Sequence, residues 1–120
     1  MTETFRDLVV WQEAMNLVEM IYLQTKSFPK EETYGLTNQI RRAAVSIPAN
    51  IAEGNARRGR KEYLHFLSMA NGSVAELETH ILIAERLNYM TKEAASQLQT
   101  QIQSVGRLLA ALKKSLTSIP

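Results

Sequence analysis

Apolar residues recur three and four positions apart along most of the chain, which is the spacing of amphipathic helices. This pattern predicts four helices, at about residues 8–26, 33–53, 60–88 and 91–117. Alternation of period two is almost absent, so a β-sheet is disfavoured. We therefore expect an all-α protein, with one domain over residues 1–120 that folds as an antiparallel, up-and-down four-helix bundle.

Capping and turn-forming residues mark the expected helix ends. Asp7 and Thr91 are expected to cap the first and last helices. Phe28 precedes Pro29, and a residue before proline avoids the helical conformation, so the first helix should end before this pair. Gly54 is expected just beyond the second helix, where a left-handed residue often follows the last turn.

Pro48 lies within the second predicted helix, where its missing N–H and its ring are expected to produce a kink after Ala44. We interpret this kink as a packing feature. Small residues on the second and third helices are expected to allow a close approach: Ala43, Ala44, Gly72 and Ser73. Gly72 costs about 1 kcal/mol relative to alanine in a helix interior, so a near backbone contact is its expected compensation.

Two runs of consecutive apolar residues, 81–84 and 108–112, are wider than one buried stripe requires. They predict a second apolar face used in subunit packing. The alternative is a wide core contact beneath long neighbouring helices.

Composition narrows the class of protein. The 120 residues are 45% hydrophobic and 22% charged, as in an ordinary globular domain. The absence of cysteine excludes a disulfide framework and thiolate chemistry and fits a reducing compartment. No apolar run approaches the roughly 18 residues of a membrane span. We expect a cytoplasmic protein with no membrane partner.

Positive charge is concentrated between residues 38 and 62, where six cations face only Glu53 and Glu62, although the formal net charge of the whole chain is +2. The cations are Arg41, Arg42, Arg57, Arg58, Arg60 and Lys61. Several lie beside the start of the third helix, where the macrodipole is already positive, so folding alone would disfavour them there. An anion such as phosphate would complete this site, and arginine binds phosphate through two hydrogen bonds.

The alternative is that these cations solubilise a loop or pair with glutamates. Tyr63 and Phe66 are the aromatic residues close by, fewer than a platform for stacked bases requires, so base-specific readout is not predicted.

Catalytic and metal-binding patterns are weak. Glu62 and His65 have the Glu-x-x-His spacing of di-metal bundles, but such sites need a second copy, and His80 has Leu77 at the matching position. Glu76 and His80 are expected to form a solvated pair. We predict no enzymatic activity, no cofactor and no metal.

Five segments together resemble a known family: Phe5-Arg6-Asp7-Leu8, Val10-Trp11-Gln12, Tyr34-Gly35-Leu36, the block from Gln39 to Gly54 and the block from Gly72 to Glu78. They are similar to the four-helix-bundle proteins encoded within 23S rRNA intervening sequences. The resemblance implies a left-handed bundle that assembles as a homopentamer with a central channel and has no established enzymatic activity.

A more distant resemblance is to the accessory variability protein of diversity-generating retroelements, a pentamer that binds a reverse transcriptase and nucleic acid. Our leading hypothesis is a non-enzymatic homo-oligomer that binds RNA or another nucleic acid through the arginine-rich junction of helices two and three. The alternative is a protein-protein adaptor that docks a partner enzyme and does not contact nucleic acid.

Overall fold

The computed structural model describes residues 4–118, so the first three and last two residues of the predicted domain lie outside it. These residues form four long helices, α1 (Val9–Thr25), α2 (Leu36–Ala56), α3 (Arg60–Arg86) and α4 (Lys92–Thr117), and two 3-10 turns, η1 (Phe5–Asp7) and η2 (Lys30–Glu32). No strand occurs in the described part of the chain. The predicted four-helix, all-α fold is confirmed.

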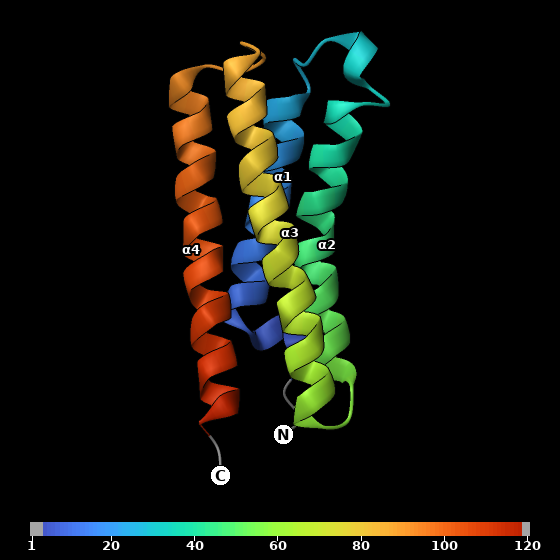
Figure 1. Cartoon of the computed structure of the whole chain (residues 1–120), viewed down its shortest axis with the longest axis vertical. Helices are drawn as coiled ribbons and strands as arrows, with labels where there is room; N and C mark the ends of the chain where they lie inside the picture. The colour runs from blue at the N-terminus through green and yellow to red at the C-terminus, as the bar shows by residue number, and fades with distance from the viewer. Residues whose placement is uncertain (1–3, 119–120) are drawn as a thin grey trace.

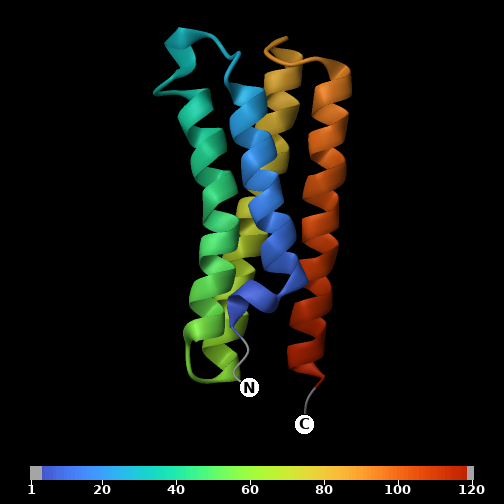
Figure 2. The same cartoon turned by 180° about the vertical axis from the view of Figure 1, so that it is seen from behind.

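The chain passes up α1, down α2, up α3 and down α4 in Figure 1, and the reverse view in Figure 2 shows the same order. Each helix packs against two others: α1 and α3 both contact α2 and α4. The bundle extends 49 Å along its axis and 23 by 22 Å across it. As a result, η1, the α2–α3 connection and the C-terminal turn of α4 lie at one end.

One stripe of each long helix is buried in a common core. The largest fully buried side chains include Leu17, Ile21, Ile40, Ile47, Ile51, Leu67, Leu77, Ile81, Leu98, Ile102 and Leu109. Burying one such side chain stabilises a fold by about 1.5–3 kcal/mol. None of the helices in residues 4–118 has both the length and the apolar character needed to cross a membrane.

The ends of α2 differ from the sequence prediction. The helix begins at Leu36 instead of near residue 33, because η2 and Gly35 occupy the preceding positions. It continues to Ala56, so Gly54 is buried inside its last turn and does not follow the helix. Gly54 is needed there for space: an added Cβ would lie 2.8 Å from the Cβ of Phe66 on α3.

The predicted caps have different outcomes. Thr91 caps α4 by accepting a hydrogen bond from the backbone N–H of Ala94 at 3.1 Å, as predicted. Asp7 does not cap α1, whose N-cap residue is Leu8. Asp7 belongs to the preceding turn η1, where its carboxylate accepts the backbone N–H of Thr4 at 3.2 Å.

The small residues of α2 and α3 were also predicted only in part. Ala43 and Ala44 are buried, as is Pro48 inside α2, and Ser73 on α3 is hydrogen-bonded to the Ser46 hydroxyl at 2.5 Å. The prediction was wrong for Gly72, which is exposed and would place a Cβ in open space. Its position on α3 turns to solvent, so no close backbone contact compensates for its helix cost.

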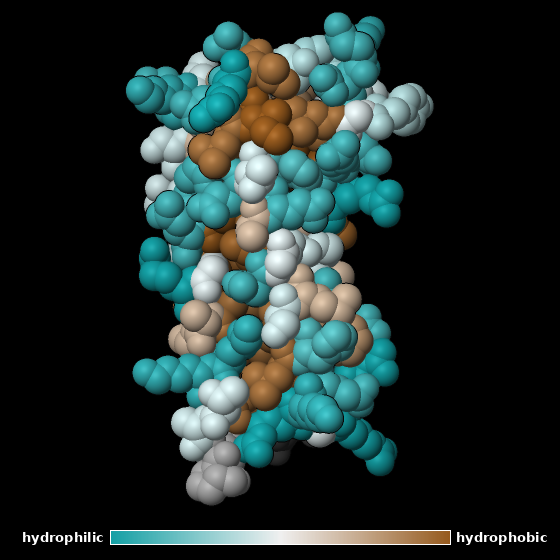
Figure 3. Space-filling view, viewed as in Figure 1, coloured by the Kyte–Doolittle hydropathy of each residue, from teal (hydrophilic) through white to brown (hydrophobic). Residues whose placement is uncertain are grey.

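The two apolar runs serve different purposes. On α3, Leu82 and Ile83 are 51% and 40% exposed, and Figure 3 shows apolar surface over the upper part of this helix. On α4, Leu108 and Leu112 are half-buried against the core. A wide core contact therefore explains the run on α4, whereas the run on α3 leaves apolar surface uncovered within one chain.

Glu32 joins the start of α2 to the α3–α4 connection. Its carboxylate accepts the backbone N–H of Leu36 at 3.0 Å and the hydroxyl of Tyr89 at 2.9 Å. These hydrogen bonds, the first more strongly than the second, lower the pKa of Glu32 below its ordinary value of 4.5. The Glu32 carboxylate raises the pKa of the Tyr89 hydroxyl in turn.

A lowered folded-state pKa gives stability that is complete above the unfolded-state pKa and lost as the pH falls through the folded-state value. We therefore expect Glu32→Gln to be less stable than the wild type at pH 7, with the difference narrowing below pH 4.5. Urea unfolding at pH 7 and about pH 3, below the usual carboxyl range, measures this. The neighbouring exposed Glu31→Gln is the control, and a Glu32→Gln difference that is independent of pH would contradict the assignment.

Candidate nucleic-acid interface

Four of the six predicted cations lie in the short connection between α2 and α3. Arg57 follows α2 in an extended conformation, and Gly59 has a φ of 97°, a left-handed conformation that suits glycine. This turn brings the chain directly into α3, which begins at Arg60. All four cations, Arg57, Arg58, Arg60 and Lys61, are exposed at the end of the bundle.

Arg57 is already paired with acidic side chains. Its guanidinium lies 2.6 Å from the Glu53 carboxylate and 3.8 Å from that of Glu62. It also lies 4.9 Å from the ring centre of Phe66. For this residue the structure agrees with the alternative reading, in which a cation of the cluster pairs with glutamates.

Arg58 and Lys61 differ from Arg57, because neither forms an ion pair with a carboxylate of residues 4–118. Both flank the N-terminus of α3, where Gly59 supplies no side-chain cap. The first N–H groups of a helix carry partial positive charge and have no partner within the helix. The exposed charge of these two side chains therefore adds to that of the helix end.

The structure separates Arg41 and Arg42 from this cluster, so the predicted six-residue patch is wrong in its extent. Arg57 follows Arg41 by sixteen positions, with continuous α2 between them, which corresponds to about 24 Å along the axis. Arg41 instead contacts α1, where its Nε donates to the Thr25 hydroxyl at 2.9 Å. Arg42 is exposed on α2.

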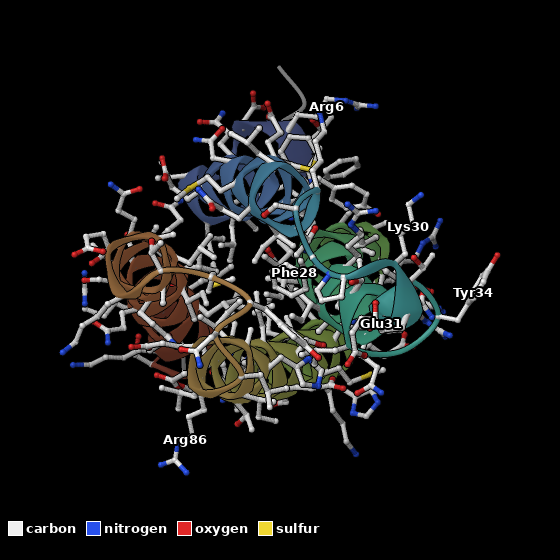
Figure 4. The ribbon with its side chains drawn as sticks, turned by 90° about the horizontal axis from the view of Figure 1, so that it is seen from above. Arg6, Phe28, Lys30, Glu31, Tyr34 and Arg86 are labelled. Atoms are coloured by element: carbon white, nitrogen blue, oxygen red, sulfur yellow. The ribbon has the colours of Figure 1, made fainter. Side chains whose placement is uncertain are left out.

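Three cations from other parts of the sequence lie at the same end of the bundle as the α2–α3 connection. They are Arg6 on η1 and Lys113 and Lys114 on the last turns of α4 (Figures 1 and 2). Figure 4 shows Arg6 at the periphery of the bundle. Residues 4–7, 53–62 and 110–118 together contribute seven cations and three carboxylates. We call this the positive end.

The opposite end is electrically balanced. Residues 23–36 and 85–95 contribute four cations and four carboxylates. Arg6, Lys113 and Lys114 were missed because they are remote from the arginine cluster in sequence. An up-and-down order of four helices, which the sequence did predict, is the signal that would have placed both chain ends beside the second connection.

The two histidines do not form a catalytic or metal-binding group within residues 4–118. His80 is buried, and its Nε2 lies 3.9 Å from the Glu76 carboxylate, so the predicted solvated pair is wrong for the histidine. The other ring nitrogen of His80 has no hydrogen-bond partner among the described residues. His65 is exposed beside Phe66. Within residues 4–118 no group of three histidine or acidic side chains is placed to hold a metal ion.

These features define a class: an all-helical four-helix protein with a cationic surface at one end. Within this class, the family model of the 23S rRNA-intervening sequence proteins matches residues 6–111, and the chain belongs to that family. The resemblance to this family that the sequence indicated is thereby confirmed.

A solved structure with the same fold comes from Bacteroides thetaiotaomicron and is described as a protein of unknown function from the S23 ribosomal protein family. It superimposes with a TM-score of 0.80 at 23% identity, over 88% of this chain and 99% of the other. At this identity the likeness shows the fold alone. No curated protein matches the chain.

Proposed function

We propose that the protein binds nucleic acid through the phosphate backbone at its positive end and that it is not an enzyme. The supporting observation is the excess of seven cations over three carboxylates at one end of a chain whose formal net charge is only +2. Arg58 and Lys61 are central to the surface because no carboxylate of the described residues neutralises them. Arg6, Arg60, Lys113 and Lys114 extend it.

The chemistry of the surface favours backbone contacts over base recognition. Lysine and arginine bind phosphate oxygens and release condensed counterions, which supplies affinity without regard to sequence. Near the connection, Phe66 is half-buried beneath Arg57 and Tyr63 is half-buried beside Asn55, so neither ring is a free platform for a base. RNA is the leading ligand class, with single-stranded DNA as the comparison.

The proposal includes assembly as a homopentamer, the state that the family resemblance implied. Support comes from three apolar side chains near the C-terminal end of α3, Leu82, Ile83 and Leu87, which are 40–51% exposed in one chain. Five linked positive ends would raise avidity without stronger individual contacts. Sedimentation equilibrium should give five times the chain mass of 13.6 kDa, whereas a monomer at micromolar concentration would refute the assembly.

The binding proposal predicts a strong dependence on salt. For single strands, log K falls by about 0.7 per phosphate contact for each unit of log salt concentration, so about five contacts imply a loss near a hundredfold between 50 and 200 mM KCl. Fluorescence anisotropy with labelled single-stranded RNA measures this slope. Affinity that does not change with salt would refute backbone binding. Copurification of a stoichiometric protein, with no nucleic acid, would support the adaptor alternative.

A further inference from the structure

A second cationic feature lies toward the opposite end of the bundle, between the C-terminal turn of α1 and the first turns of α2. A cavity of about 320 Å³ is present there. Its lining includes Thr25, Lys26, Phe28, Lys30, Thr37 and Arg41. Three of the residues around this cavity are cations and none is a carboxylate, so the lining favours an anion.

Arg41 is held in place at this cavity. Its Nε donates to the Thr25 hydroxyl at 2.9 Å, and its guanidinium lies 4.5 Å from the ring centre of Tyr22. Thr25 is itself 2% exposed and donates to the carbonyl of Ile21, which fixes the acceptor. A guanidinium has five N–H donors, and one further contact, to the Tyr22 carbonyl at 3.5 Å, leaves three of them without a partner in the described chain.

Arg41 also forms no ion pair with a carboxylate of residues 4–118. A half-buried arginine whose position is fixed by neutral partners is a preorganised anion-binding group. Its guanidinium is already ordered, so anion binding costs little additional side-chain entropy.

Thr37 is an independent sign of a missing partner. The residue lines the same cavity and is only 7% exposed, yet its Oγ1 has no hydrogen-bond partner among the described residues. Buried hydroxyls are nearly always hydrogen-bonded. Thr37 also lies in the first turn of α2, where the helix dipole favours negative charge. The Glu32 carboxylate accepts the N–H of Leu36 in this turn at 3.0 Å and lies outside the cavity lining, which leaves the N–H groups that follow Leu36 for an anion.

We propose that this cavity binds the phosphate group of a phosphomonoester. The Arg41 guanidinium would bind the phosphate oxygens, and Lys26 and Lys30 supply further positive charge. The Thr37 hydroxyl is covered in this structure and would turn toward the phosphate to donate to it. Phe28 lies toward the bundle axis and Lys30 at the periphery in Figure 4, so the pocket has an apolar inner side and a charged outer side. It is separate from the positive end, and it does not rest on the proposed function.

The test compares two adjacent arginines. Isothermal titration with inorganic phosphate should give at least a tenfold weaker affinity for Arg41→Gln than for the wild type, with no change for Arg42→Gln. Arg42 carries the same charge and is exposed outside this cavity's lining, which makes it a matched control. Lys30→Gln, an exposed change that the fold should tolerate, should weaken binding several-fold and keeps the test valid if Arg41→Gln unfolds. The proposal would be overturned if the wild type and the three variants bound phosphate with equal affinity, or if the wild type did not bind phosphate.

Two further probes distinguish a phosphorylated RNA end from a free mononucleotide as the ligand of the cavity. One is adenosine 5′-monophosphate, and the other is an eight-nucleotide RNA prepared with a 5′-phosphate or a 5′-hydroxyl. Tighter binding of the phosphorylated RNA that Arg41→Gln removes would identify an RNA end, whereas an Arg41-dependent affinity for the mononucleotide alone would identify a free metabolite. Affinities that do not depend on Arg41 for either probe would overturn the proposal. We expect Arg41→Gln to leave binding of the 5′-hydroxyl RNA at the positive end unchanged, so the two proposals fail separately.

Discussion

Replacing Arg58, Lys61 and Lys114 together by glutamine is expected to weaken binding of single-stranded RNA by about a hundredfold at 100 mM salt. At this concentration each lost phosphate contact removes a counterion-release contribution near 1 kcal/mol, so three contacts account for the loss. The slope of log K against log salt concentration should fall by about 2. All three side chains are exposed, so the fold should not change.

The matched control removes the same charge elsewhere. Arg42, Arg86 and Lys92 are exposed and lie outside the positive end, and their replacement by glutamine should leave the RNA affinity within about threefold of the wild type, as expected when no direct phosphate contact is lost. Anisotropy titrations of both variants at several salt concentrations give the affinities and slopes. Equal losses in the two variants would show that net charge, and not the positive end, governs binding.

Arg57 is compatible with this surface although it is paired in the free protein. Its side chain is 43% exposed and that of Glu53 is 52% exposed. An ion pair exposed to this degree is typically worth less than about 1 kcal/mol because water and salt screen it. A phosphate approaching the connection can therefore compete for the guanidinium, whereas the proposed contacts of Arg58 and Lys61 would not require an ion pair to break.

The sequence predicted those features that local spacing controls. The repeats of three and four residues identified all four helices, because one buried stripe per helix is enough to drive packing. The cluster from Arg57 to Lys61 was also predictable, since neighbouring residues in a short turn stay close in space. Spacing could not place Arg6 and Lys114 at the same end of the bundle, because that placement depends on how the helices are arranged.

For the same reason, the sequence did not show that Arg41 and Arg57 lie far apart. Both belong to a basic segment of the sequence. Because α2 is continuous between them, the sixteen positions from Arg41 to Arg57 correspond to about 24 Å along the helix axis. The two parts of the segment consequently face different environments. One lies in an exposed turn beside glutamates, and the other is fixed against the hydroxyl of Thr25. A single patch in sequence becomes two candidate anion sites in the fold.

Glycines show a further limit of sequence analysis, because a residue without a side chain gives no apolar or polar signal. Gly54 was predicted to end a helix and Gly72 to allow close packing, but the structure gives the packing role to Gly54 and exposes Gly72. Which face of a helix a glycine occupies depends on the rotation of that helix against its neighbours. That rotation is set by the buried stripe and becomes visible only when the helices are packed.

Gly54→Val is expected to destabilise the protein by about 3 kcal/mol, at the upper end of the usual cost of overpacking. The new Cβ would lie 2.8 Å from the Cβ of Phe66 and 3.1 Å from the ring of Tyr63. Rotating the Phe66 side chain cannot relieve the first contact, because a Cβ atom moves only with its backbone. The start of α3 must therefore shift away from α2, which also displaces the positive end and should weaken RNA binding.

Gly72→Ala, on the neighbouring helix α3, is expected to stabilise the protein. Its added Cβ would meet no atom of another helix within 4 Å. Alanine is favoured over glycine by about 1 kcal/mol in a helix interior, so this variant should be more stable than the wild type with unchanged RNA affinity. Urea unfolding of both variants measures the two free energies. If Gly54→Val proved as stable as the wild type, the close approach of α2 and α3 beside the connection would be wrong, and with it the geometry that places Arg58 and Lys61 at the end of the bundle.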